Sequence, residues 1–492
     1  MYFCSVHTCY RHTHHNANIN IRPANHISEY GEPANYRYLY VLNRPANFME
    51  QTEYSRKKIW RITYPVLISL LTEHLIGMTD TAFMGHVGET ELGASAIAGV
   101  YYLVLYMIGF GFSIGAEILM GRRNGERQYR SIGNIFFQGT AMVLMIAAAV
   151  TLLSYTASPY LLRRIIASDS IYEATMSYID LRIWGMFFSL TACMFRAFYM
   201  ATTRTSILTI NGIIMVISNV LLNYIFVFGK LGLPAMGIAG AAIGSTISEF
   251  ISAAFFVIYT RTRTDYRRYG MFRFTRLSGY IQRQILSLSG WTTLQYFIST
   301  ATWLFFFLAI EHLGERQLAI SNIVRNVSSF FYMFVSAFAS TCTAIVSNLM
   351  GRGKTNEVMP VCSRIMKMCA LTILPLFIIV MLIPHLVMYI FTENTDLITA
   401  AIPSMRVMLL IYAVNVPAYV FFLAVSGTGN TRTAFFIELA ATILYVMYIN
   451  ITAVWLKTDI AICWISDAVY AIALLVFSVW YLNKANWQHN RI

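Results

Sequence analysis

Twelve apolar segments, each long enough to cross a lipid bilayer, follow one another along most of this chain. A transmembrane helix needs about 20 predominantly apolar residues. The segments lie at residues 60–84, 94–120, 132–156, 176–200, 205–229, 237–260, 285–310, 318–349, 364–390, 404–426, 434–456 and 460–482. Lipid offers no hydrogen-bond partners, so each segment has to satisfy its own backbone groups, and a helix does this within one segment. The sequence therefore predicts an all-α polytopic membrane protein with twelve transmembrane helices.

Composition supports this class and argues against others. Of the 492 residues, 57% are hydrophobic and 12% are charged, whereas soluble domains have about 25% charged residues. The sequence has no nucleophile elbow and no His-Glu-x-x-His word, and the cysteines within the apolar segments lack the spacing of metal ligands. We therefore expect no enzyme and no cofactor.

The net charge of +13 comes from basic residues that fall mainly on one side of the predicted membrane segments. The richest stretches on that side are residues 56–61, 122–130, 261–283 and 352–367. Short loops rich in Lys and Arg stay in the cytoplasm. This pattern predicts a protein of the cytoplasmic (inner) membrane with both termini inside the cell. The charge is thus explained by orientation, and we expect no nucleic-acid partner.

Residues 1–48 differ from the rest of the chain. They are polar, contain five histidines and repeat the word Pro-Ala-Asn at residues 23–25, 33–35 and 45–47. A histidine-rich tract can bind metal, but this composition favours a disordered tail. We expect the natural protein to begin at Met49, where an ordinary polar lead into the first helix starts.

The two halves of the chain repeat each other. The word Leu-Met-Gly-Arg ends segment 2 at 119–122 and segment 8 at 349–352, and Thr-Arg-Thr occurs at 203–205 and 431–433. Parallel repeats of this kind are typical of transporters that handle a substrate between two halves. We therefore expect two pseudo-symmetric six-helix lobes, with the N-terminal lobe and its basic linker at 49–280 and the C-terminal lobe at 281–492.

Segment 1 carries acidic residues inside its apolar run. Glu73 and Asp80 are seven residues apart and so share a helix face, with Gly77 leaving room between them. An acid at membrane depth costs about 2.5 kcal/mol or more on insertion scales, and it marks a functional site by default. Pro65 near the start of the segment can bend the helix. Pairing with other buried polar groups is the structural alternative.

Further polar residues lie within the later segments. Asn219 and Asn223 are one helical turn apart and face the same way; such amides either join helices or line a polar cavity. Other members of this group are Ser245, Glu249, Gln295, Asn322, Asn415, Glu438 and Asp467. For the acids among them, we favour neutralisation by the two intramembrane arginines, Arg196 and Arg325.

Several of these motifs together resemble the multidrug and toxic compound extrusion (MATE) transporters. They are Pro65 with Asp80-Thr-x-x-x-Gly-x-x-Gly88, Asn219-x-x-x-Asn223, Gly237-Ile-x-Gly-Ala-Ala242 and Gly427-x-Gly-Asn-Thr431. The resemblance runs from Met49 to the C-terminus. It implies two lobes around a central cavity and the efflux of organic, often cationic compounds. The efflux would be driven by proton or sodium entry through alternating access.

The resemblance also assigns candidate sites. Asp80 matches the family's first-helix acid, and Asn219 and Ser245 match its polar partners. The sequence departs from many members at Asn223, Gln295 and Asn415, where they carry acids, which argues against a cation site in the C-terminal lobe. The expected cation-coupling residues are Asp80, Glu73, Asn219, Asn223 and Ser245. If the coupling ion is sodium, we expect Asp80, Asn219 and Asn223 to bind it. The expected substrate-cavity residues are Gln295, Asn322, Asn415 and Glu249.

Two other functions compete with a cation-coupled exporter of small organic substrates. A flippase for a lipid-linked oligosaccharide or lipid has a related fold, but its phosphate-bearing substrates call for a wide basic cavity, and this chain has few intramembrane cations. A membrane-embedded enzyme needs a catalytic constellation at depth that the sequence lacks. We expect the protein to act as a monomer in the bilayer.

Overall fold

The computed structural model describes residues 54–273, 275–389, 394–485 and 487–489. Contacts within the chain divide it into Met1–Gln51 and Thr52–Ile492. The expected tail at 1–48 and the expected start at Met49 lie outside the described residues. All of the described helices belong to the second unit.

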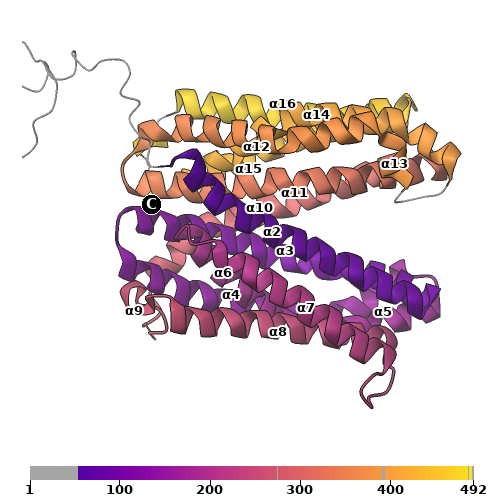
Figure 1. Ribbon diagram of the computed structural model, residues 1–492, viewed down its shortest axis with the longest axis horizontal. Helices are drawn as coiled ribbons and strands as arrows, with labels where there is room; N and C mark the ends of the chain where they lie inside the picture. Colours follow the sequence, from indigo (N-terminus) through magenta and orange to yellow (C-terminus); the bar gives the residue numbers. More distant parts are fainter. Residues whose placement is uncertain (1–53, 274, 390–393, 486, 490–492) are drawn as a thin grey trace, which may run out of the picture. The chain divides into compact units, whose positions relative to one another are not determined.

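In the described part of the chain, the regular structure is entirely helical (Figure 1). The first half forms α2 (Arg56–Val87), α3 (Glu89–Gly125), α4 (Tyr129–Ile165), α5 (Asp169–Arg182), α6 (Gly185–Ala201), α7 (Ser206–Phe228) and α8 (Gly237–Arg263). The short helix α9 (Tyr266–Tyr269) lies in the linker. The second half forms α10 (Gly279–Glu311), α11 (Glu315–Gly351), α12 (Val358–Leu382), α13 (Pro384–Tyr389), α14 (Thr395–Gly427), α15 (Thr431–Ile449) and α16 (Ile460–Lys484).

These helices confirm the predicted all-α membrane fold. Among the described residues, 11 helices are long and apolar enough to cross a membrane, and α5 and α6 form a further span bent by 51°. The predicted segment at 176–200 is therefore a broken helix. After the bend, the second helix of the pair begins at Gly185. Segment 11 ends in a wider π-helical stretch at Asn450–Trp455.

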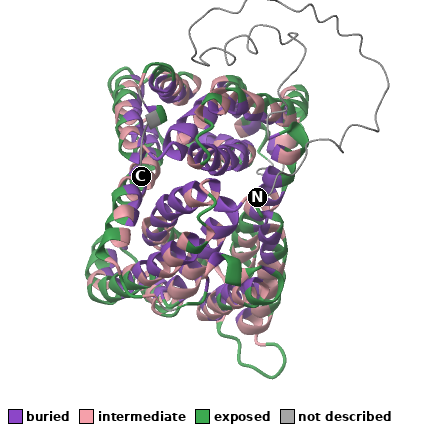
Figure 2. Ribbon diagram, turned by 90° about the vertical axis from the view of Figure 1, so that its left-hand side faces the viewer, coloured by how far each residue is buried: buried purple, intermediate pink, exposed green. Residues whose placement is uncertain are grey.

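The helices pack into two bundles that follow the two halves of the sequence (Figure 1). Viewed along the helices, buried residues face the inside and exposed residues form the rim (Figure 2). Large apolar side chains on the rim are well exposed, with Leu152 67% and Leu371 71% exposed. An exposed apolar surface of this extent fits the hydrocarbon of a bilayer.

The first helix of each half begins in the core of the opposite lobe. Ile59 and Ile62 of α2 are buried with the apolar residues of α11, α12 and α14. In return, Ile285 and Leu288 of α10 belong to the apolar core built by α3, α4 and α6. The two lobes are thus joined by an exchange of helix ends, in addition to packing of α3 against α10 and α11.

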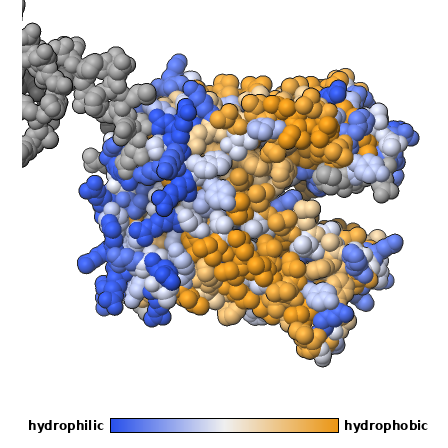
Figure 3. Space-filling model, in the orientation of Figure 1, coloured by the Kyte–Doolittle hydropathy of each residue, from blue (hydrophilic) through white to orange (hydrophobic). Residues whose placement is uncertain are grey.

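The exchange keeps the lobes together at one end, whereas the other end is open. Figure 3 shows a hollow between the lobes on the side where α5 and α13 lie in Figure 1. At the opposite end, glycines bring α3 close to α10: a Cβ on Gly115 would lie 2.5 Å from Ser289 Cα. The hydroxyl of Ser289 donates to the Phe112 carbonyl at 2.8 Å. Hydrophilic residues cover this closed end (Figure 3).

Pro65 lies inside α2, where two threonines at the start of α7 bond to backbone carbonyls next to it. The Thr205 hydroxyl donates to the Ile62 carbonyl at 2.7 Å, and the Thr209 hydroxyl donates to the Pro65 carbonyl at 3.3 Å. These contacts position α7 along the first helix. Threonine hydroxyls from a neighbouring helix thus supply hydrogen bonds to the backbone around the proline of this membrane helix.

Candidate functional site

A chain of hydrogen bonds joins α2, α7 and α8 inside the N-terminal lobe. Asn223 Nδ2 donates to Asp80 Oδ1 at 2.6 Å and to Asn219 Oδ1 at 3.3 Å. Asn219 Nδ2 in turn donates to Ser245 Oγ at 3.1 Å. Both asparagines are fully buried. The structure therefore brings together four of the five expected coupling residues, and the two asparagines share a helix face as predicted.

A buried ion pair lies beside this chain. The two Nη atoms of Arg182 donate to the two carboxylate oxygens of Glu249 at 2.7 and 2.5 Å. The Tyr102 hydroxyl donates to the same carboxylate at 3.3 Å, and the Arg182 guanidinium lies 4.0 Å from the Tyr102 ring centre. A two-pronged pair of this kind holds both side chains in one geometry.

The prediction that Arg196 or Arg325 neutralises Glu249 is wrong, because Arg182 does so. Arg182 is the last residue of α5, directly before the bend, and Gly185 begins α6. A Cβ on Gly185 would collide with both Glu249 Oε2 and Arg182 Nη1. The bend and the glycine together give the guanidinium access to α8, which a straight helix over 176–200 would not provide.

The ion pair and the hydrogen-bonded chain form one electrostatic site. Asp80 interacts with the charges of Arg182 and Glu249, and Tyr178 lies near both Arg182 and Asp80. The site therefore contains two acids and one arginine, drawn from α2, α5 and α8. Since Glu249 already holds the arginine in a two-pronged pair, Asp80 is the acid whose charge is less completely balanced.

Glu73 has a different set of neighbours from Asp80. It lies near Ser69 and interacts with the charge of Arg196 on α6. Seven residues of α-helix extend about 10 Å, so a shared face does not bring the two carboxylates into contact. The structure places Glu73 outside the hydrogen-bonded chain that holds Asp80.

Sequence analysis missed Glu117 of α3, which is 2% exposed and interacts with the same arginine, Arg196. The signal was present, because Glu117 is an acid inside the apolar run 94–120. Glu73, Glu117 and Arg196 therefore form a second charged group in the N-terminal lobe. Arg196 also lies 5.1 Å from the Phe110 ring centre.

The expected substrate-cavity residues do not line one common cavity. Asn415 lines a cavity of about 50 Å³ with tyrosines of the C-terminal lobe, among them Tyr412 and Tyr445. Asn322 lines an apolar pocket of about 520 Å³ between α3, α10 and α11. Gln295 is 4% exposed, and its Oε1 has no hydrogen-bond partner. Glu249 lies in the N-terminal lobe.

The two acids of the C-terminal lobe are also not neutralised as predicted. Tyr470 donates to Glu438 Oε1 at 3.1 Å, and Asp467 lines the same small cavity as Tyr445. No ion pair in the described part of the chain includes either acid. Arg325, one of the expected partners, lies over the Phe307 ring at 4.4 Å.

The residues around Asp80 have suitable atoms for a sodium ion. Hard cations prefer carboxylate and amide oxygens. Asn223 Oδ1 is buried and has no hydrogen-bond partner, although Nδ2 of the same residue donates to both Asp80 and Asn219. Among the described residues, no group of three or more His, Cys, Asp or Glu side chains could hold a metal ion. A proton on Asp80 or a monovalent cation bound through oxygens therefore fits this site.

Comparison with known proteins matches both halves of the chain. The family model described as MatE matches residues 65–225 and again residues 292–452. The two matches cover corresponding helices of the two lobes, which agrees with the internal repeat. A relative from Idiomarina loihiensis, named "Probable multidrug resistance protein NorM", is 26% identical over 61% of this chain and 65% of its own length. The chain thus spans slightly less than two thirds of the length of this curated relative.

Solved structures share the fold. A protein titled "Outward-facing conformation of a multidrug resistance MATE family transporter of the MOP superfamily" has a TM-score of 0.81 and 16% identity, covering 88% of this chain and 97% of that one. A MOP superfamily transporter from Pyrococcus furiosus has a TM-score of 0.80 and 17% identity over 87% of this chain and 97% of that one. At this identity, the likeness is one of fold.

Proposed function

The chain belongs to the multidrug and toxic compound extrusion (MATE) family, and from this premise we propose that it exports small organic, often cationic compounds. Entry of protons or sodium ions supplies the energy, and the two lobes give access to each side of the membrane in turn. The similar protein of Idiomarina loihiensis carries a multidrug resistance name, which supports this substrate class.

The hydrogen bond between Asp80 and Asn223 is the observation that carries the coupling proposal. Asp80 Oδ1 accepts the Asn223 amide at 2.6 Å, and this contact joins α2 to α7. A proton or cation that binds Asp80 competes with the amide for the same oxygen. Its arrival therefore weakens one contact between the two helices and changes how α2 packs. Glu73 on the same helix has a supporting role through Arg196.

Sodium, as the transported ion, would be held by Asp80, Asn219 and Asn223, with Ser245 completing the polar group. Asn223 would have to turn its carbonyl oxygen, which has no partner now, toward the ion. The proton alternative needs no such turn. Asp80 is required in both cases, because an asparagine there neither titrates nor carries the charge.

The charges at membrane depth favour this function over lipid flipping. A flippase for phosphate-bearing lipids calls for a basic cavity, whereas Arg182 is paired with Glu249 and Arg196 lies near Glu73 and Glu117. Arg325, stacked over Phe307, is the exception. A substrate entering from the hollow between the lobes would thus meet mostly balanced charge and many aromatic rings, which suit flat cations.

Transport into inverted vesicles, driven separately by a proton gradient and a sodium gradient, tests the proposal. Asp80→Asn should abolish uptake of a fluorescent organic cation under the gradient that drives the wild-type protein, while its binding is partly retained. Asp169→Asn is the matched control, since this exposed acid on α5 pairs only with Arg163 at the surface. Gln295→Ala and Asn415→Ala should weaken substrate binding more than coupling. Undiminished gradient-driven uptake by Asp80→Asn would disprove the assignment.

We further propose that the protein works as a monomer in the cytoplasmic membrane, with both termini and the linker around Arg267 inside the cell. The placement of basic residues supports this orientation. In this orientation the hydrophilic closed end faces the cytoplasm, and the hollow between the lobes opens outward (Figure 3).

A further inference from the structure

A pocket of about 520 Å³ lies between α3 of the N-terminal lobe and α10 and α11 of the C-terminal lobe. We call it the lobe-interface pocket. It lies on the open side of the close contact between Gly115 and Ser289, where α3 and α10 no longer touch so tightly. Its lining is aliphatic or aromatic, as at Val104, Met107 and Phe297, except for Thr300, Asn322 and Arg325. The pocket is therefore a largely apolar space with polar side chains from α11.

Arg325 supplies the positive charge of the lobe-interface pocket. The residue is half-buried, and its guanidinium lies 4.4 Å from the Phe307 ring centre and 5.8 Å from the Trp303 ring centre. No acidic residue lines the pocket, and among the described residues no ion pair includes Arg325. Aromatic rings stabilise a cation only in part. The hydrogen-bond donors of this guanidinium therefore remain for an anionic partner.

The positions of the lining residues along the helices match the dimensions of one lipid leaflet. Phe307, next to Arg325, stands four residues before Glu311, the last residue of α10. Phe297 lies ten residues further into the same helix, a distance of about 15 Å. This is about half of the ~30 Å hydrocarbon core of a bilayer. The charged end of the pocket thus lies near the end of the helix, and its apolar part extends toward the apolar middle of the protein (Figure 3).

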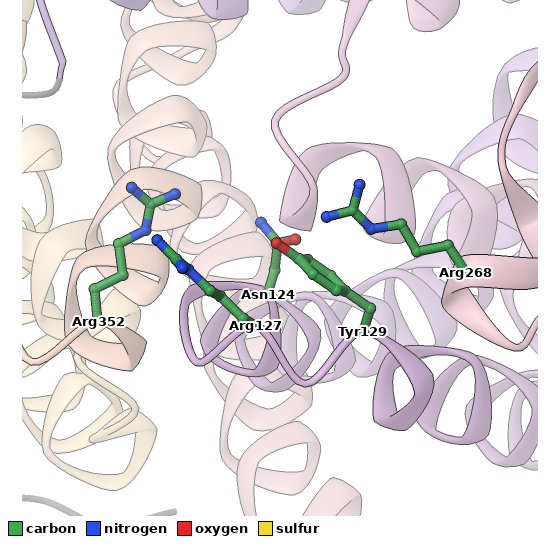
Figure 4. A pocket seen from close by; sticks show the side chains of 5 residues that line it. All are labelled: Asn124, Arg127, Tyr129, Arg268 and Arg352. Atoms are coloured by element: carbon green, nitrogen blue, oxygen red, sulfur yellow. The ribbon is translucent and has the colours of Figure 1, made fainter. Parts of the chain in front are cut away.

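A second pocket, at the closed end, holds arginines in a different environment. It is lined by Asn124, Arg127, Tyr129, Arg268 and Arg352 (Figure 4). All three of these arginines are exposed at the hydrophilic end, where water and dissolved ions solvate them. Arg325 is instead half-buried among apolar side chains. Electrostatic attraction is stronger where less water surrounds the charges, so an anion gains more from contact with Arg325.

We propose that the lobe-interface pocket binds one phospholipid with a net negative headgroup, taken from the membrane leaflet on the side of the open end. The Arg325 guanidinium donates paired hydrogen bonds to the phosphate, the Asn322 amide offers a further donor, and an acyl chain lies against the apolar lining. Basic pockets between membrane helices recognise anionic lipids in this way. A zwitterionic headgroup carries its own cation and therefore attracts Arg325 less. This site is separate from Asp80 and does not depend on which compound is exported.

Native mass spectrometry of the purified full-length protein tests the site by counting bound lipids. The protein in detergent is titrated with an equimolar mixture of phosphatidylglycerol and phosphatidylcholine. Arg325→Gln removes the charge, Arg325→Lys keeps it, and Val104→Trp fills the apolar part while Arg325 stays. Arg316→Gln is the matched control, because Arg316 is an exposed arginine at the start of the same helix and does not line the pocket.

We expect the wild-type protein and Arg316→Gln to retain one phosphatidylglycerol in preference to phosphatidylcholine by about tenfold, as a charged hydrogen bond allows. Arg325→Gln should lose this preference, Arg325→Lys should keep part of it, and Val104→Trp should lose the bound lipid. Melting temperatures without added lipid verify that each variant is folded. An unchanged preference in Arg325→Gln or Val104→Trp, or no preference in the wild-type protein, would overturn the proposal. So would displacement of the lipid by glycerol phosphate, which has no acyl chain.

Discussion

Asn124 Nδ2 donates a 2.6 Å hydrogen bond to Asn348 Oδ1, and the two asparagines stand near the ends of corresponding helices, α3 and α11, in the two halves of the chain. Asn348 is fully buried and also donates to the Ala201 carbonyl at 2.8 Å. Glycines on both helices let the backbones approach at this point. If the protein works by the proposed alternating access, opening of this end has to break this contact.

Gly351→Ala should hold the closed end apart. A Cβ at this position would collide with the backbone carbonyl oxygen of Arg122 on the opposite half, and backbone atoms cannot move aside cheaply. We expect transport to fall at least tenfold, with a longer distance between spin labels placed across the closed end. Gly290→Ala serves as the control, because open space surrounds this α10 glycine. Unchanged label distances in Gly351→Ala would contradict the expectation.

Arg182→Met should destabilise the protein by about 3–5 kcal/mol, because it leaves the Glu249 carboxylate buried without its cation. The double variant Arg182→Met/Glu249→Met should recover much of this loss, since neither charge is then left unpaired. Unfolding in denaturant measures both values. Equal destabilisation by the single and double variants would show that the ion pair is not what holds α5 to α8.

Thr205→Val should lower the free energy of unfolding by about 1 kcal/mol, because it removes the buried hydrogen bond from the Thr205 hydroxyl to the Ile62 carbonyl. Thr262→Val is the comparison, since the exposed Thr262 hydroxyl bonds only within its own helix, to the Ile258 carbonyl. We expect the comparison variant to stay within about 0.5 kcal/mol of the wild-type protein. A similar effect of the two substitutions would rule out a special role for Thr205.

Cysteine labelling should reveal the orientation in the membrane. We expect Lys230→Cys, between α7 and α8, to react with an impermeant thiol reagent added outside intact cells. Arg267→Cys, in the linker helix α9, should react only after the cells are permeabilised. The native cysteines of the described helices are buried and should react slowly, but Cys4 and Cys9 have to be replaced first. The reverse pattern would invert the proposed orientation.

The apolar segments were enough to predict the fold, because the length of a membrane helix is fixed by the bilayer. The spacing of Asn219 and Asn223 likewise predicted their shared face, since four residues make about one helical turn. Both inferences depend on local geometry. The residue pattern along a single helix is therefore sufficient to predict both.

The partners of the charged residues depend on geometry that a single helix does not reveal. Arg182 reaches Glu249 because the chain bends between α5 and α6, and no residue pattern in 176–200 predicted that bend. Glu73 shares a face with Asp80 but lies two turns away, next to Arg196 of another helix. Sequence analysis therefore identified Asp80, Glu73 and Glu249 but missed Glu117, and the pairing of these acids required the packing of helices against one another.

The exchanged ends of α2 and α10 have a consequence for how the protein is made. Ile285 and Leu288 complete the apolar core of the N-terminal lobe, yet the ribosome adds them only after all of α2–α8. The N-terminal lobe therefore remains incompletely packed in the membrane until the start of α10 has been synthesised and inserted. If the chain is divided in the linker and expressed as two fragments, we accordingly expect both to fold stably only when they are expressed together in the same cell.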